Sequence, residues 1–342
     1  MTYQVSSSER LRPIGAETET KALLYLMNFS ENRNEIYYFV IDFFNDVTAM
    51  SSSGSKIWDL QSKGKKNSTP KEIGRELVTL FKNYESEFQF DGLILFLDSV
   101  SSTVRVDGKQ NVFTIDNITE TAKLSIIKGL KEEANKKEYI NNSSITEASI
   151  NSFLNSIVFV VNDKSKADYI REIIVNHPKI VPDDNLLNSI FEELKKIQSS
   201  KKDMNIVEGV SINYVDEALN FNRHLTKGEI ELLTLQRIIN RNPISDGAPI
   251  SFLNTINYLS ESDKRECIEE CQRKLVSALF NKNATKEFWN LFSNIYTTVI
   301  DNVNDDVQSV FAKIDHQLIE SHPNFDILSV KYFISVLKEG LH

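Results

Sequence analysis

The order of apolar and polar residues predicts a helix followed by strands at the start of the chain. Over residues 16–29, apolar side chains recur three and four positions apart, which is typical of a helix with one buried face. Residues 35–49 are rich in β-branched and aromatic residues and predict one strand, or two with a bend near Asn45. A serine-rich turn at 51–54 then leads into an alternating segment at 56–63, which predicts a further strand.

A second helix and a fourth strand follow this hairpin. Thr69 is a suitable N-cap and Pro70 a typical first helical residue, so a helix is expected over residues 71–84. The short apolar run at 93–98 is of the kind found in a strand that is covered on both faces. The first hundred residues therefore predict an α/β fold in the order helix, three strands, helix, strand.

The character of the chain changes after these elements. Residues 118–138 and 145–155 predict two more helices, and residues 157–161 predict another apolar strand. Beyond that strand, apolar positions recur only at helical spacing. We therefore expect two domains, an α/β domain over residues 1–165 and an all-α docking or regulatory domain over residues 166–342.

Composition narrows the class of protein. Of 342 residues, 41% are hydrophobic and 25% are charged, which is the mix of a globular protein and excludes wholesale disorder. No run of about 18 apolar residues predicts a membrane span, and the start has no apolar leader. Cys267 and Cys271 lack partner ligands for a metal and cannot form a disulfide framework. We therefore expect a cytoplasmic protein that does not act at a membrane.

Charge is distributed unevenly along the chain. The 39 basic and 48 acidic residues give a net charge of −9, which excludes a polycation that coats nucleic acid. Between Lys56 and Lys82, however, seven basic residues accompany three acidic ones. Lys65, Lys66 and Lys71 are the candidates for contacts with DNA phosphates, which position a duplex without reading its sequence. An ordinary solvated loop and helix face explains this basic segment equally well.

Polar residues at the ends of two predicted strands carry the candidate chemistry. Asp46 lies where the second strand begins, and Gln61 and Lys63 share a face of the third because they are two positions apart. Antiparallel pairing of these strands brings Asp46 beside Gln61 and Lys63. Because Mg²⁺ prefers oxygen ligands, Asp46, the Gln61 side-chain carbonyl and the main-chain carbonyl of Ser62 can supply three of them.

A lysine at such a site completes a catalytic set. Lys63 can orient the attacking water, assist its deprotonation and balance the charge of a phosphate. These groups together are suited to metal-assisted hydrolysis of a phosphodiester. Each residue alone is more often a solvated strand or turn residue, and only the combination favours a site. Asp42 is expected to be solvated, and Asp59, which shares the Gln61 face, is expected to be peripheral.

The spacing Asp46…Gln61-Ser62-Lys63, within this order of elements, resembles the PD-(D/E)xK nuclease superfamily. The segments IDFFNDVTAM and KIWDLQSKGKKNSTPKEIGREL are similar to the nuclease domain of CD-NTase-associated double-stranded DNA endonucleases, which also occurs in Lamassu-like antiphage effectors. The similarity covers roughly residues 10–100 and does not reach the helical half. It implies a restriction-endonuclease-like core, Mg²⁺ or Mn²⁺ as cofactor and double-stranded DNA as substrate.

The resemblance also implies a glutamate ligand from the first helix. Glu19 fits best because it precedes Leu23 and Leu26 by one and two turns, and Glu17 is the alternative. Many relatives carry Glu where this chain has Gln61, so one metal site is expected to be weaker. The implied function is a Mg²⁺-dependent endodeoxyribonuclease of an antiphage system that acts with partner subunits or as a homo-oligomer. The alternative is a nuclease-like binding or assembly subunit without catalysis.

Overall fold

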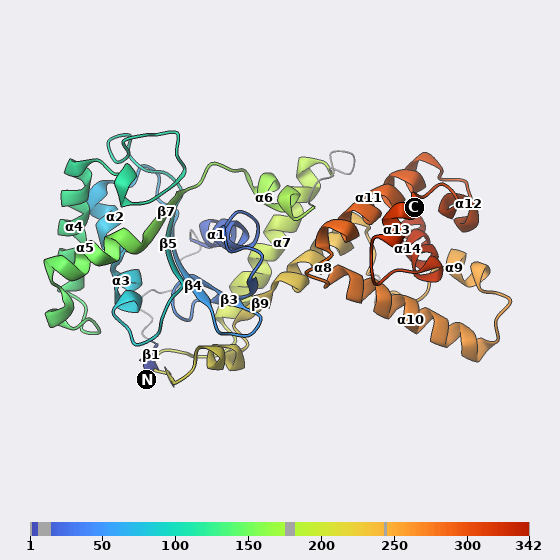
Figure 1. Cartoon of the computed structure of the whole chain (residues 1–342), viewed down its shortest axis with the longest axis horizontal. Coiled ribbons are helices and arrows are strands. Elements are labelled where there is room, and N and C mark those ends of the chain that lie inside the picture. Colours follow the sequence, from blue (N-terminus) through green and yellow to red (C-terminus); the bar gives the residue numbers. More distant parts are fainter. Residues whose placement is uncertain (1, 6–14, 175–181, 243–244, 342) are drawn as a thin grey trace. The chain divides into compact units, whose positions relative to one another are not determined.

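The structure, a computed structural model, has a mixed α/β architecture (Figure 1). It describes residues 2–5, 15–174, 182–242 and 245–341. In this part of the chain, no helix is both long enough and apolar enough to span a lipid bilayer. The architecture combines a mixed sheet with numerous helices, and its C-terminal region is helical.

The chain divides into two compact units. The first comprises residues 1–165 together with 192–227, and the second comprises 166–191 together with 228–342. Residues 192–227 therefore fold with the α/β part, although the sequence places them in the helical domain. The physical reason is pairing of main-chain groups, because two short strands in this segment bond to strands near the N-terminus.

A mixed sheet of seven strands, counted over the described residues, forms the centre of the first unit. The strand order is β6-β7-β5-β4-β3-β2-β9, in which β4 is antiparallel to β3 and parallel to β5. The strands are β2 (Ile36–Ile41), β3 (Val47–Ser51), β4 (Ile57–Lys63), β5 (Gly92–Leu97), β6 (Val112–Phe113), β7 (Ile157–Val161) and β9 (His224–Thr226).

The predicted order of helix, three strands, helix and strand is present. Helix α1 (Ala16–Asn28) precedes β2, β3 and β4, and the bend expected near Asn45 separates β2 from β3. Asp42 closes this bend with a left-handed φ of 50° while its main-chain N–H donates to the Asp46 carbonyl at 3.1 Å. The helix expected after β4 is two short helices, α2 (Pro70–Glu76) and α3 (Val78–Tyr84).

Helices cover both faces of the sheet (Figure 1). On one face lie α2 and α3 together with α4 (Glu120–Ala134) and α5 (Glu147–Ser156), and α1 lies on the other. The start of α2 has the predicted cap, because the Thr69 main-chain N–H donates to the Glu72 carboxylate at 3.0 Å. Apolar side chains from α2, α3, α4 and α5 and from β5 and β7 form one continuous core.

Helices α2 and α4 cross at two glycines, where their main chains almost touch. A Cβ atom at Gly74 would lie 2.1 Å from the Ile126 carbonyl oxygen, and one at Gly129 would lie 2.2 Å from that of Lys71. Neither distance is sterically possible, since each contact is with main chain and not with a flexible side chain. The packing of α4 on α2 therefore depends on the absence of side chains at both positions.

Gly74→Ala is expected to lower the free energy of unfolding by about 1–3 kcal/mol, because the helices must separate. The sign of this change in stability distinguishes a hindered from an open position, because Gly→Ala in an unhindered helix stabilises the protein by roughly 1 kcal/mol. Gly108→Ala is the control, because a Cβ there has nothing within 4 Å. Urea denaturation measures both variants. Equal midpoints for the two would contradict the close helix crossing.

Short strands beyond residue 166 were not predicted, so the prediction of an all-α segment there is wrong. Strand β8 (Ser211–Ile212) pairs with β1 (Tyr3–Gln4), and β9 pairs with β2. Strands of two or three residues carry too few positions for a hydrophobic period. A 3-10 helix, η3 (Val215–Phe221), lies between them.

The second unit is helical in its described residues. Its core lies between α11 and α14, where Phe288, Trp289 and Phe292 are buried and Phe292 stacks on Phe333 at 5.7 Å. Its helices are α6 (Lys166–Ile173), the start of α7 (Asp184–Lys202), α8 (Lys227–Ile238), α9 (Ile250–Thr255), α10 (Glu261–Leu279), α11 (Thr285–Asp301), α12 (Val307–Phe311), α13 (His316–Glu320) and α14 (Ile327–Gly340).

Candidate functional site

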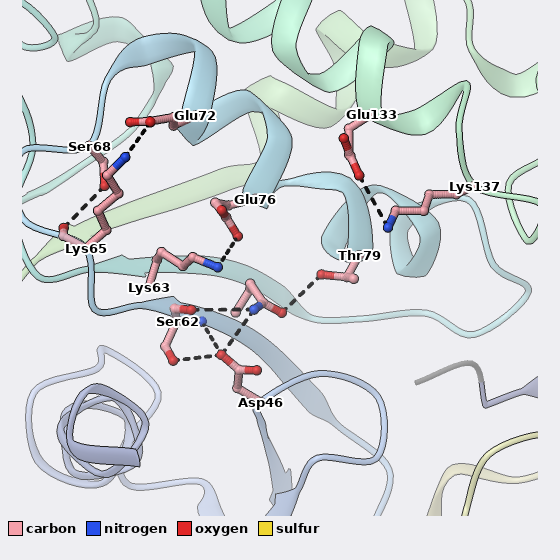
Figure 2. Close-up of polar contacts among 11 residues, drawn as sticks. Asp46, Ser62, Lys63, Lys65, Ser68, Glu72, Glu76, Thr79, Glu133 and Lys137 are labelled. Carbon is pink, nitrogen blue, oxygen red and sulfur yellow. Dashed lines mark hydrogen bonds and ion pairs between the residues drawn. The ribbon is translucent and has the colours of Figure 1, made fainter. Parts of the chain in front are cut away.

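The antiparallel pairing of β3 and β4 brings Asp46 to the end of β4. Val47 lies opposite Leu60, so Asp46, which precedes β3, lies beside Gln61 and Ser62. The Gln61 side-chain nitrogen donates to Asp46 Oδ2 at 3.1 Å, and the Ser62 main-chain N–H and hydroxyl donate to the same oxygen at 2.7 Å each (Figure 2). The expected approach of Asp46 to Gln61 is therefore present, whereas Lys63 pairs with Glu76.

Helices α2 and α3 cover the face of β4 that carries Gln61. Two residues of a strand and four residues of a helix both advance by roughly 6–7 Å, so alternate strand positions meet successive helical turns. Two of the resulting polar pairs are Lys63 Nζ with Glu76 Oε2 at 2.9 Å and Thr79 Oγ1 with Gln61 Oε1 at 3.1 Å (Figure 2). A third is Asn83 Nδ2 with Asp59 Oδ2 at 2.7 Å.

The Gln61 carboxamide is held at both ends. Its nitrogen donates to Asp46 Oδ2 and, at 3.5 Å, to the Ser62 carbonyl, while its oxygen accepts from Thr79. A half-turn of the amide exchanges these atoms, and the Thr79 hydroxyl can serve as acceptor as well as donor. Gln61 Oε1 would then lie about 3.1 Å from Asp46 Oδ2 and about 3.5 Å from the Ser62 carbonyl oxygen.

This spacing fits two ligands of a small divalent cation. Adjacent oxygens of an octahedral Mg²⁺ at roughly 2.1 Å are about 3 Å apart, which matches the separation between the Gln61 amide and Asp46 Oδ2. In the described ranges, no set of three or more His, Cys, Asp and Glu side chains is arranged to hold a metal. The donors that fit are therefore one or two carboxylates plus neutral oxygens, a set that Mg²⁺ accepts when it keeps several waters.

The negative charge of Glu19 acts on the Asp46 carboxylate. Burial of the Asp46 side chain, followed by the negative charge of Glu19, raises the pKa of Asp46 to about 8. The Ser62 hydrogen bonds and the positive charge of Lys202 act in the opposite direction. Glu17, the alternative ligand from α1, binds Lys21 at 3.1 Å. Glu19 is therefore the glutamate of α1 that interacts with Asp46.

The raised pKa of Asp46 predicts a pH-dependent stability in EDTA. Its usual value is 3.8, so the folded protein takes up a proton that the unfolded chain lacks between pH 4 and 8. The free energy of unfolding of the wild type should therefore fall across this window and level off above pH 8. For a partly buried carboxylate we expect a change on the order of 2 kcal/mol.

Asp46→Asn is the comparison for this measurement. Asparagine has nearly the shape of a protonated aspartic acid, and its side chain stays uncharged at every pH. Denaturation with urea from pH 4 to 9 in EDTA measures both proteins. The difference between them should grow with pH until about pH 8. Parallel curves for the two proteins would show that Asp46 is ionised throughout.

Two basic residues that sequence reasoning missed approach the acidic side chains of the site. Lys202 Nζ lies 2.5 Å from Glu19 Oε2, and Arg223 Nη2 lies 3.0 Å from Asp42 Oδ2. Asp42 is thus paired rather than solvated. Both basic residues come from the 192–227 segment, which is remote in sequence, so no local motif indicates them. Glu76 and Thr79 were missed too, and only the spacing of α2 and α3 against β4 could have suggested them.

Asp59, which was expected to be peripheral to the site, is buried in the structure. Its side chain has no exposed area, and it accepts hydrogen bonds from Thr48 and Asn83 at 2.6 and 2.7 Å and from Asn45. Burial raises the pKa of this carboxyl, whereas these donors lower it. Asp59 therefore joins β3, β4 and α3 beneath the candidate site.

The predicted DNA-contacting lysines lie at the end of β4 and the start of α2. Lys65 pairs with Glu72, and Lys71 Nζ lies 2.8 Å from Glu132 Oε2. Lys65 and Lys66 are exposed in the loop that follows β4. Exposed ion pairs of this kind are weak, so a phosphate can replace either carboxylate.

The two cysteines lie one turn apart on α10 in the second unit. Cys271 is buried, and burial raises the pKa of both thiols. In the described residues, no group of three or more His, Cys, Asp and Glu side chains gathers around them to hold a metal. The candidate site residues Asp46, Gln61, Lys63 and Glu19 all belong to the first unit.

No protein-family model matches the chain, and no curated protein or solved structure matches it either.

Proposed function

We propose that the chain is a metal-dependent DNA endonuclease whose site contains Asp46, Gln61, Lys63 and Glu19. The observation that carries this proposal is the contact between the Asp46 carboxylate and the Gln61 carboxamide at the end of β4, where the negative charge of Glu19 also acts on Asp46. Lys63 lies two residues beyond the amide on the same strand, as the resemblance to PD-(D/E)xK nucleases implies. The order α1, β2–β3–β4, α2–α3 and β5 supports a restriction-endonuclease-like core.

Asp46, Glu19, the turned Gln61 amide and the Ser62 carbonyl would hold Mg²⁺ or Mn²⁺. A bound ion supplies a Lewis acid for the phosphate oxygen and lowers the pKa of a coordinated water. The chain's own contribution begins with Ser62, whose two hydrogen bonds fix Asp46 Oδ2. Thr79 then holds the Gln61 amide in the plane that faces Asp46.

Lys63 is the proposed water-positioning residue. Its ammonium binds Glu76 at the edge of the site, where the Lys63 side chain is 29% exposed. A phosphate of the substrate competes with Glu76 for this ammonium, which draws Lys63 toward the scissile group. Lys65, Lys66 and Lys71 would contact phosphates on either side, because all three lie at the same end of β4 and α2.

The substrate class and the cellular role follow from the resemblance. We propose double-stranded DNA as the substrate and an antiphage defence complex, with partner subunits or further copies of this chain, as the setting. The helical second unit is the proposed docking or regulatory part. Its described helices pack around aromatic side chains of their own core, so docking would use surfaces outside that core.

A specific observation supports the alternative function. The Gln61 amide donates to Asp46 where a metal ligand must offer oxygen, and Glu76 neutralises Lys63. A binding or assembly subunit with a nuclease-like fold would tolerate both arrangements. The two functions differ in whether any phosphodiester bond is broken.

A substrate panel tests the proposed function. The full chain is incubated with duplex DNA, single-stranded DNA and RNA of one sequence in Mg²⁺, Mn²⁺ or EDTA, with and without proteins encoded beside it. We expect metal-dependent cuts in duplex DNA. Retention of DNA in a mobility-shift assay without cleavage under any condition would favour the alternative.

A further inference from the structure

Lys202, the last residue of α7, reaches the carboxylates of the candidate site. Its ammonium lies 2.5 Å from Glu19 Oε2, and the two side chains are only 11% and 12% exposed. Burial, the strongest influence, lowers the pKa of Lys202, but Glu19, Asp42 and Asp46 together raise it above its usual value. Three acidic residues therefore act on this one ammonium group.

The position of Lys202 is fixed by the rest of its helix. One turn earlier on α7, Gln198 Oε1 accepts a hydrogen bond from Thr20 Oγ1 of α1 at 2.8 Å. Thr20 follows Glu19 directly, so the two contacts join the same turns of the two helices. Both Thr20 and Gln198 are buried. The packing of α7 on α1 therefore holds Lys202 beside Glu19.

We propose that Lys202 is the built-in counter-cation of the metal-free site and that it sets the affinity for the divalent metal. This inference rests on the proposed function, because it takes Glu19 and Asp46 as metal ligands. The ammonium occupies a Glu19 oxygen that the metal needs, and its positive charge repels a second cation. Binding of the metal therefore requires that Lys202 release Glu19.

Removal of this ammonium should tighten metal binding. Lys202→Met retains the length of the side chain and its packing against α1, but it frees the Glu19 oxygen and leaves the site more negative. We expect the dissociation constant for Mn²⁺ to fall about tenfold, which corresponds to about 1.4 kcal/mol. Lys202→Arg retains the charge and should keep an affinity close to that of the wild type.

Isothermal titration calorimetry of the full chain with Mn²⁺ and Mg²⁺ measures these affinities. Lys201→Met is the matched control, because it removes the same charge from the neighbouring position of α7. Thermal melts in EDTA report folding, and Lys202→Gln replaces the Met variant if the latter does not fold. An unchanged or weaker affinity in the neutral variants, or an equal gain in Lys201→Met, would overturn the inference.

Asp46→Asn separates this inference from the proposed function. We expect it to abolish binding in both the wild-type and the Lys202→Met backgrounds. If neither the wild type nor any of the variants binds either metal, the proposed function and the inference both fail. If the wild type binds in an Asp46-dependent manner and Lys202→Met binds no tighter, only the role of Lys202 fails.

Discussion

Asp46→Asn is expected to reduce metal-dependent DNA cleavage by about 10²-fold or more. Asparagine keeps the size of the side chain and an oxygen that can accept from the Ser62 main-chain N–H. It removes the negative charge with which Asp46 would bind the metal. Folding should survive, because burial and Glu19 already favour the neutral form of Asp46 in the metal-free protein. Initial rates of plasmid nicking in Mg²⁺ and in Mn²⁺ measure the loss.

Asp107→Asn is the control for this substitution. Asp107 lies in an exposed loop and accepts a hydrogen bond from the Lys109 main-chain N–H, so its replacement changes the same charge away from the site. It should cleave at the wild-type rate. Nicking by Asp46→Asn within a few-fold of the wild type would contradict the placement of the metal at the end of β4.

Lys63→Ala should also reduce cleavage by about 10²-fold or more, since a positioned proton-transfer group contributes 10²–10⁴-fold. Its effect on stability should be within about 0.5 kcal/mol, because the ammonium binds Glu76 at the partly exposed end of β4. Nicking assays and urea denaturation of the same preparations separate the two effects.

Two matched variants sharpen this prediction. Glu76→Gln releases the Lys63 ammonium without removing it, so it should keep cleavage activity. Lys65→Ala removes a charge two positions farther along and should weaken DNA binding without abolishing cleavage. A loss of stability in Lys63→Ala as large as that from a core truncation, about 2 kcal/mol or more, would show that Lys63 is structural.

Local sequence patterns predicted the elements that they directly specify. The Thr69 cap and the bend near Asn45 are present, because capping and turn formation depend on neighbouring residues. The approach of Asp46 to Gln61 was also predicted, because a short serine turn leaves antiparallel pairing as the simplest arrangement. These features involve contacts between residues fewer than twenty positions apart.

Contacts that span the chain were not predicted. Lys202 reaches Glu19, and Arg223 reaches Asp42, through a segment that leaves the helical unit and rejoins the sheet. Strand β9 in that segment has three residues, which is too short for a period of two to be recognised. The basic partners of the site therefore carried no local signal, whereas its acidic residues did.

Nicking of a supercoiled plasmid by the full chain tests the central claim most directly. The wild type, in Mg²⁺ and with the proteins encoded beside it, should convert supercoiled plasmid into open-circular and linear forms. EDTA should prevent this conversion, and so should Asp46→Asn. Cleavage that persists in EDTA or in Asp46→Asn, or a plasmid left intact by the wild type in both Mg²⁺ and Mn²⁺, would contradict a metal-dependent nuclease site at Asp46.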